Sequence, residues 1–119
     1  MAARSLEGKV DMIYTSTDNN VVSAYESLYQ AAKESKIPLI ASDTSSVERG
    51  AIAALGVNYY DLGRETGKIV VRILNGEKAG AIPIYTPKVL DLYVSPKHAK
   101  EQGITLPQAV MDKAKEVVE

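Results

Sequence analysis

The sequence contains no cysteine, tryptophan or phenylalanine, and its only histidine is His98. Without cysteine the chain has no disulfide, no thiol nucleophile and no cysteine-based zinc site, although this absence does not indicate a cellular compartment. Fourteen basic and fifteen acidic residues leave a formal net charge of −1. A chain so close to neutrality lacks the general positive field that attracts nucleic acid or anionic lipid. We therefore expect no nucleic-acid partner.

Long apolar runs are also missing. The densest apolar stretch, residues 69–74, is interrupted by Arg72, whereas a membrane-spanning helix needs roughly 20 apolar residues. The first seven residues lack the apolar core of a secretory signal. What is present, 119 residues of which 45% are hydrophobic and 24% charged, is typical of one globular domain. We expect a single α/β unit over residues 1–119.

Short apolar runs alternate with segments of helical periodicity along the chain. The first run, residues 10–14, precedes a polar loop in which Asn19 or Asn20 is suited to cap a helix. Ser45 and Glu48 have the spacing of a capping box, and Asp61 is suited to cap a long third helix. The pattern predicts strands over residues 10–14, 39–41, 52–58 and 84–94 (bent at a proline), and helices over residues 21–36, 45–50, 61–75, 96–102 and 107–117.

Strands that alternate with helices predict an α/β fold with three layers, in which helices cover a mostly parallel sheet. In such folds ligands bind beyond the carboxyl ends of the strands. Three loops qualify, at residues 15–20, 42–46 and 58–61, and all are rich in short polar side chains. The sequence therefore predicts a small-molecule site at this edge of the sheet.

Two carboxylates, Asp18 and Asp43, each follow a predicted strand. Such a pair can hold Mg²⁺, act as acid and base, or bind an ammonium group. Each also has a structural interpretation, in which Asp18 organises a turn and Asp43 assists the cap at Ser45. The Thr-Ser-Thr-Asp sequence at residues 15–18 lacks the adjacent carboxylates of a metal or phosphoacceptor site. An ammonium ligand needs only one carboxylate, so of the three possibilities it requires the fewest specific residues.

Other kinds of chemistry find little support. The sequence has no nucleophile elbow, no dinucleotide fingerprint and no P-loop, and His98 lies among lysines in a segment predicted to be a solvated helix face. Tyr25 and Tyr29 fall on the apolar face of the first helix and are predicted to lie in the core. The apolar stripe of the third helix is also predicted to be buried; it comprises Leu62, Thr66, Ile69, Val70, Ile73 and Leu74. We expect no catalysis, no cofactor and no metal.

Two longer stretches go beyond a general α/β pattern. One is Gly-Lys-Val-Asp-Met-Ile-Tyr at residues 8–14, which continues through Thr-Asp-Asn at residues 17–19. The other is Ile-Pro-Leu-Ile-Ala-Ser-Asp at residues 37–43, followed by residues 50–63 and by Ile-Leu-Asn-Gly-Glu at residues 73–77. Together they resemble the C-terminal part of ABC-transporter substrate-binding proteins of the type I periplasmic class, in the subfamily for uptake of tryptophan, tyrosine and related amino acids.

In that family two Rossmann-like lobes, joined by crossover strands, close over the ligand. The resemblance implies that this chain is most of the second lobe with the C-terminal crossover and helices, and that the first lobe is absent. It also implies an extracytoplasmic location and an ABC permease as partner of the full-length protein. The residues implied to contact a small ligand, an amino acid, are Thr17, Asp18, Asn19, Asp43, Thr44 and Ser45, with Asn58 and Tyr59 near the crossover. Either Asp18 or Asp43 would bind the ligand ammonium group, while hydroxyls and helix N-termini would hold its carboxylate.

A chain without the first lobe poses a packing problem, because the helix over residues 61–75 would pack on that lobe. Two arrangements are open: the helix folds back on its own sheet as in flavodoxin, or two copies exchange elements in a homodimer, which we favour. Half of the cleft would be missing, so ligand binding should be weak or absent. The alternatives to a solute-binding module are a receiver-like or flavodoxin-like regulatory or enzymatic domain that uses the strand-end carboxylates with Mg²⁺, and an inactive folding fragment.

Overall fold

The computed structural model describes residues 2–119, which form two compact units. The first unit comprises residues 2–56 and 91–119, and the second comprises Val57–Leu90. The elements of the first unit are η1 (Ala2–Leu6), β1 (Ile13–Thr15), α1 (Asn19–Ser23), α2 (Tyr25–Ser35), β2 (Leu39–Ala41), η2 (Thr44–Val47), β3 (Ala53–Gly56), β4 (Asp91–Val94), α4 (Pro96–Glu101), α5 (Gln108–Met111) and β5 (Glu116–Val117). The second unit contains α3 (Tyr59–Leu74) and η3 (Ala79–Ala81).

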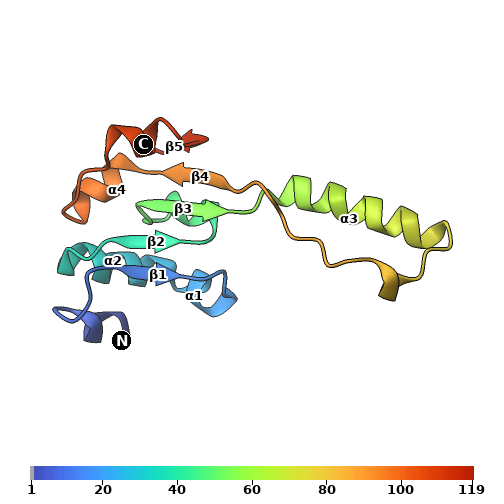
Figure 1. Ribbon diagram of the computed structural model, residues 1–119. Helices are drawn as coiled ribbons and strands as arrows, with labels where there is room; N and C mark the ends of the chain where they lie inside the picture. The colour runs from blue at the N-terminus through green and yellow to red at the C-terminus, as the bar shows by residue number, and fades with distance from the viewer. Residues whose placement is uncertain (1) are drawn as a thin grey trace. The chain divides into compact units, whose positions relative to one another are not determined.

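The first unit is built on a five-stranded sheet with the strand order β1-β2-β3-β4-β5 (Figure 1). Strands β1, β2 and β3 are parallel to one another, β4 runs antiparallel to β3, and β5 runs parallel to β4. Ile13 pairs with Leu39, and Gly56 pairs with Asp91. The prediction of an α/β fold with a mostly parallel sheet is confirmed.

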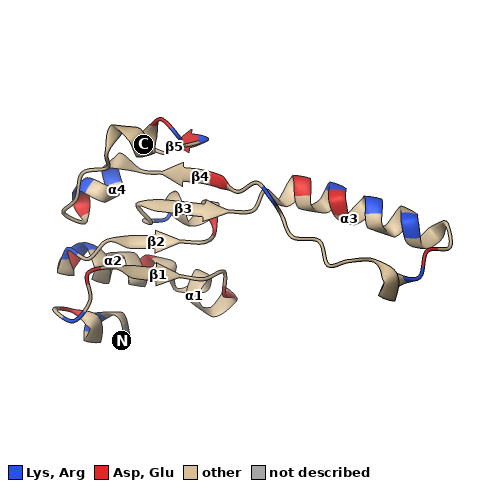
Figure 2. Cartoon of the chain, in the orientation of Figure 1, with Lys and Arg blue, Asp and Glu red and all other residues tan. Residues whose placement is uncertain are grey.

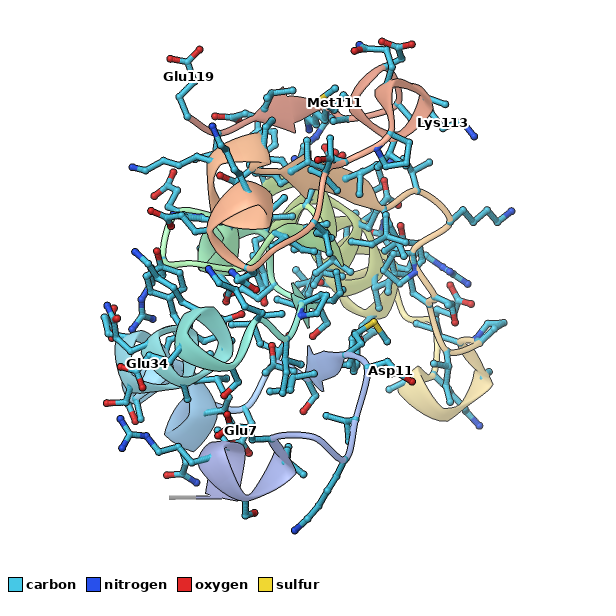
Figure 3. The ribbon with its side chains drawn as sticks, turned by 90° about the vertical axis from the view of Figure 1, so that its left-hand side faces the viewer. Glu7, Asp11, Glu34, Met111, Lys113 and Glu119 are labelled. Atoms are coloured by element: carbon cyan, nitrogen blue, oxygen red, sulfur yellow. The ribbon has the colours of Figure 1, made fainter. Side chains whose placement is uncertain are left out.

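The core of the first unit lies on one face of this sheet. Ile13 and Thr15 of β1 are buried, whereas Tyr14 between them is exposed, as expected for a strand with one covered face. Tyr25 of α2 is buried in the same hydrophobic cluster as Ile13 and Leu39, which confirms the core position predicted for it. Charged side chains lie on the outside, and Figure 3 shows those of Glu34, Lys113 and Glu119, among others, directed away from the ribbon.

The predicted first helix is divided in two. Asp18, rather than Asn19 or Asn20, caps α1: its Oδ1 accepts hydrogen bonds from the backbone N–H groups of Asn20 and Val21, at 2.9 and 3.2 Å. Ala24, with φ −112° and ψ 21°, interrupts the helical backbone before α2 begins. A carboxylate can accept both N–H groups and complements the positive end of the helix, so Asp18 outcompetes the amides that follow it.

The capping box predicted at Ser45 is absent, and the helix there is a single 3₁₀ turn. Asp43 occupies the N-cap position of η2, and the hydroxyl of Ser45 donates to Asp43 Oδ2 at 2.7 Å. Ser45 lies within the turn and not at its N-cap, so its hydroxyl is not placed to accept from the helix backbone as a capping box requires.

Three predictions for the C-terminal part were wrong. Only Asp91–Val94 of the predicted strand 84–94 is a strand, because the preceding residues belong to the second unit and do not pair with the sheet. The last helix ends at Met111, and backbone bonds from Lys115 and Val118 to β4 draw Glu116–Val117 into the sheet. His98, predicted to be solvated, is buried on the inner face of α4, where its Nδ1 lies 3.0 Å from the carbonyl oxygen of Val47.

The second unit begins directly after β3 ends. Asn58, predicted as strand, caps α3 by accepting from the N–H of Asp61 at 3.1 Å, so Asp61 lies in the first turn and is not the cap. Acidic residues fall in the first half of α3 and basic residues dominate its second half, an order that complements the helix dipole (Figure 2). No residue of α3 is buried. The prediction of a buried stripe on this helix was therefore wrong for the chain by itself.

Candidate functional site

The candidate site is formed where the polypeptide leaves strands β1 and β2. These strands are parallel neighbours, so the loops that follow them emerge at the same edge of the sheet. The N–H of Ser42 donates to the carbonyl oxygen of Thr15 at 3.0 Å, and the hydroxyl oxygens of Thr17 and Ser42 lie 3.0 Å apart. The structure thus brings together the two polar loops predicted from the sequence.

The loop after β1 presents an exposed polar surface. Thr17, Asp18 and Asn19 are all exposed, and Asn19 is the first residue of α1. The carboxylate of Asp18 is occupied in part, because one of its oxygens accepts the two backbone N–H groups of the α1 cap. The structural interpretation of Asp18 as a residue that organises the turn is therefore correct.

The loop after β2 carries a carboxylate in a different environment. Asp43 and Thr44 are half-buried, whereas Ser45 is exposed. The carboxylate of Asp43 accepts one hydrogen bond from Ser45 and makes no side-chain bond to the backbone of η2. Arg49, whose positive charge interacts with Asp43, is held in a bidentate pair with Glu26 at 2.8 Å for each bond. The Asp43 carboxylate is thus less committed to local structure than that of Asp18.

Beneath the two loops lies a group of buried hydroxyls that sequence reasoning did not assign to the site. The hydroxyl of Tyr25 is 3.4 Å from that of Thr15, and the side chain of Ser46 also forms a hydrogen bond with Tyr25. Burial raises the pKa of Tyr25, and the negative charge of Asp43 adds to the shift. Tyr25 therefore stays neutral at physiological pH. The available signal was the position of Thr15, which ends β1 on the same face as Ile13.

The other two predicted ligand residues, Asn58 and Tyr59, belong to the second unit. The side chain of Asn58 caps α3, and Tyr59 in the first turn of that helix is 60% exposed. Their assignment to a ligand stays a prediction.

A hollow of about 370 Å³ lies within the second unit, between α3 and residues 82–85. Its two cations are already paired, Lys68 with Glu65 at 2.5 Å and Arg72 with Glu77 at 2.5 Å.

Across residues 2–119, no three side chains of the metal-binding types gather in one place. Within the same residues, no helix has the length and apolar character needed to cross a bilayer.

Comparison with known proteins identifies relatives for nearly the whole chain. The chain is 42% identical, over 85 residues, to a tyrosine-binding protein of Clostridioides difficile strain R20291. The structure matches that of a conserved domain protein from Vibrio cholerae O1 biovar El Tor with a TM-score of 0.87 and 39% identity. It also matches an ABC domain in complex with L-Trp from Streptococcus pneumoniae, with a TM-score of 0.82 and 32% identity.

These relatives are longer than the chain. The aligned residues make up 71% of this chain but only 25% of the tyrosine-binding protein, and the structural matches cover 98% of this chain and 40% of each solved chain. The family model described as ABC transporter substrate binding protein matches residues 1–118. The resemblance seen in the sequence is confirmed, and the chain belongs to the family of ABC transporter substrate-binding proteins.

Proposed function

We propose that this chain is part of the solute-binding protein of an ABC importer. The solute-binding protein captures an aromatic amino acid outside the cytoplasm and presents it to a membrane permease, and it carries out no covalent chemistry. Two relatives support the class of ligand, since one is named a tyrosine-binding protein and the other was solved with L-Trp. The chain corresponds, in this proposal, to most of the second lobe of the longer proteins. Their remaining length would supply the facing lobe that encloses the ligand.

The observation that carries the proposal is that the loops after β1 and β2 are hydrogen-bonded to each other. Asp43, in the second of these loops, has a carboxylate that accepts only one hydrogen bond, from the hydroxyl of Ser45. An amino acid presents an ammonium and a carboxylate group a short distance apart, so its site needs an anionic partner and hydrogen-bond donors on adjoining segments. Asp43 supplies the anion on one loop, and the hydroxyls of Thr17 and Thr44 supply donors on both.

Asp43 rather than Asp18 is the proposed partner of the ligand ammonium group. Asp18 already accepts two N–H groups from α1, so drawing it to a ligand would weaken that cap. Asp43 accepts only a hydroxyl that can rotate away, and its half-buried position strengthens an interaction with a cation. Asn19 and Ser45, at the outer ends of the two loops, complete the proposed polar rim.

The proposal is tested by titrating the chain with L-tryptophan and L-tyrosine to millimolar concentrations while its backbone amides are followed by NMR. We expect saturable shifts at residues 16–19 and 42–46. Asp43→Asn should weaken L-tryptophan binding about tenfold or more, the usual effect of losing a hydrogen bond to a charged group. Unchanged amides at residues 42–46 in the wild-type chain would contradict the proposal.

Two ligand analogues and one matched variant sharpen the test. Tryptamine retains the ammonium group and indole-3-propionate retains the carboxylate, so Asp43→Asn should weaken binding of tryptamine and leave that of indole-3-propionate unaffected. Asp11→Asn is the control, because Asp11 is exposed and lies before β1, outside both loops. A parallel Mg²⁺ titration tests the receiver-like alternative, for which Asp18 and Asp43 should respond to the metal and not to the amino acids.

A further inference from the structure

Ser42 is the first residue after β2, and it contacts the exits of both neighbouring strands. On one side its N–H donates to Thr15 at the end of β1, and its hydroxyl pairs with that of Thr17 in the loop beyond. Ser42 is therefore fixed to the β1 exit through both its backbone and its side chain.

On its other side Ser42 lies against the end of β3. A Cβ atom added to Gly56 would come within 2.7 Å of the Ser42 carbonyl oxygen and within 3.3 Å of the backbone nitrogen and Cγ2 of Thr44. Real Cβ atoms do not approach backbone oxygen so closely, so only glycine lets β3 end this near the loop. Gly56 has no positive φ, and its requirement is one of space.

We propose that Ser42, seated against Gly56, is a positioning residue that couples the β1 and β2 exit loops and so sets the spacing between Thr17 and Asp43. The inference rests on the proposed function, because that spacing matters for a ligand held by both loops. Ser42 itself is assigned no contact with the ligand. Its hydroxyl bonds to that of Thr17. The group proposed to contact the solute is the carboxylate of the next residue, Asp43.

The bond between the hydroxyls is tested first without ligand. Ser42→Ala should shift the backbone amides of residues 16–18 as well as those of residues 43–45, because loss of the bond frees both loops. Ser42→Thr, which keeps a hydroxyl, should restore the wild-type positions at residues 16–18. Ser27→Ala, at an exposed serine of α2, is the control and should shift neither loop. Shifts confined to residues 41–45 in Ser42→Ala would overturn the proposal.

The contact with Gly56 is tested by Gly56→Ala, which should displace the amides of residues 42–44 and, through Ser42, those of residues 16–18. Gly63→Ala is the matched control, because a Cβ added there meets no atom within 4 Å. An unchanged spectrum at residues 16–18 in Gly56→Ala would show that the loops are not coupled. Because these readouts need no ligand, they decide the inference even if the wild-type chain binds neither amino acid.

A ligand titration adds the functional consequence. Ser42→Ala should raise the Kd for L-tryptophan about fivefold, the change that corresponds to losing one hydrogen bond between neutral groups. Ser42→Thr should return it to the wild-type value. If the wild-type chain binds L-tryptophan and Ser42→Ala binds it equally well, the positioning role is refuted while the proposed function stands.

Discussion

The two units of the chain bury their apolar side chains to very different extents. The first unit has a core in which Leu39, Val47 and Ala54 are fully buried. Across residues 57–90, all of which the structure describes, no residue is buried, and Leu74 of α3 is 80% exposed. The first unit therefore has its own source of stability, whereas the second unit depends on local interactions.

Those local interactions are visible along α3. Asn58 caps its first turn, Thr66 bonds back to the carbonyl of Leu62 at 2.8 Å, and Arg72 pairs with Glu77 just beyond its end. Such contacts contribute little each, and most of the stability of a helix in a protein comes from the packing of its apolar face. The exposed apolar side chains of α3 are typical of a helix face that packs on a partner outside residues 57–90.

The sheet of the first unit repeats this contrast between its two faces. Ile13, Leu39 and Ala41 are buried on the inner face, while Met12, Tyr14 and Leu55 are each more than half exposed on the outer one. A mostly parallel sheet is normally covered on both faces. The outer face of the sheet is therefore, like α3, an apolar surface that its own unit leaves uncovered.

The largest expected effect comes from matched leucine truncations in the two units. Leu39→Ala should lower the free energy of unfolding by about 3 kcal/mol, because Leu39 is fully buried in β2 and its removal leaves a cavity. Leu74→Ala should change it by less than about 0.5 kcal/mol, because that side chain is already in water. Urea denaturation followed by circular dichroism measures both. Similar losses for the two variants would show that α3 is buried in solution.

A buried amide offers a second test of the core. Gln102 is fully buried after α4; its Oε1 accepts from the N–H of Leu39 and its Nε2 donates to the carbonyl of Gly50, both at 2.7 Å. Gln102→Leu should cost about 2 kcal/mol, because it leaves two buried backbone groups without partners. Gln30→Leu, at an exposed position of α2, is the control and should be nearly neutral. Equal stability of the two variants in urea would contradict this role for Gln102.

The sequence predicted well those features that depend on local pattern. The strand at residues 39–41 was predicted with the observed limits, and α4 begins at Pro96 as expected. Tyr25 is buried as its place on the apolar face of a helix indicated. The polar loops after β1 and β2 adjoin because parallel neighbouring strands must end at the same edge, so this part of the candidate site followed from topology.

Features that depend on distant partners were not predictable in the same way. His98 is polar and flanked by charged residues, yet its burial depends on Val47, 51 positions away, and on Tyr29, whose ring centroid lies 5.3 Å from its own. Val117 lies at a helical spacing from the apolar residues Val110 and Ala114, but the pairing of Glu116–Val117 with β4 makes this segment a strand. Periodicity alone predicted a buried stripe on α3, because an amphipathic pattern indicates that a face packs on a partner without identifying that partner. The resemblance, which placed the partner of this helix outside the chain, was the better guide to its exposure.

The smallest effect is expected from removing the carboxylate of one ion pair in each unit. The Arg49 guanidinium, bonded to both carboxylate oxygens, lowers the pKa of Glu26 to about 2, and Arg72 lowers that of Glu77. A lowered carboxyl pKa stabilises the folded state above the ordinary value of 4.5, and this stabilisation is lost as pH falls from 4.5 toward 2. Both pairs are open to solvent, so the changes should be modest.

Glu26→Gln should therefore flatten the dependence of the urea midpoint on pH between about pH 4.5 and 2.5. Glu77→Gln, the matched variant in the second unit, should leave the pH dependence of that midpoint unaltered, because the cooperative core lies elsewhere. Carbon-13 NMR of the two carboxyl groups checks directly that each titrates below its ordinary range. If Glu77→Gln altered the acid sensitivity of the urea transition as much as Glu26→Gln does, the two units would unfold together, and the contrast between a self-supporting core and a dependent helix would be refuted.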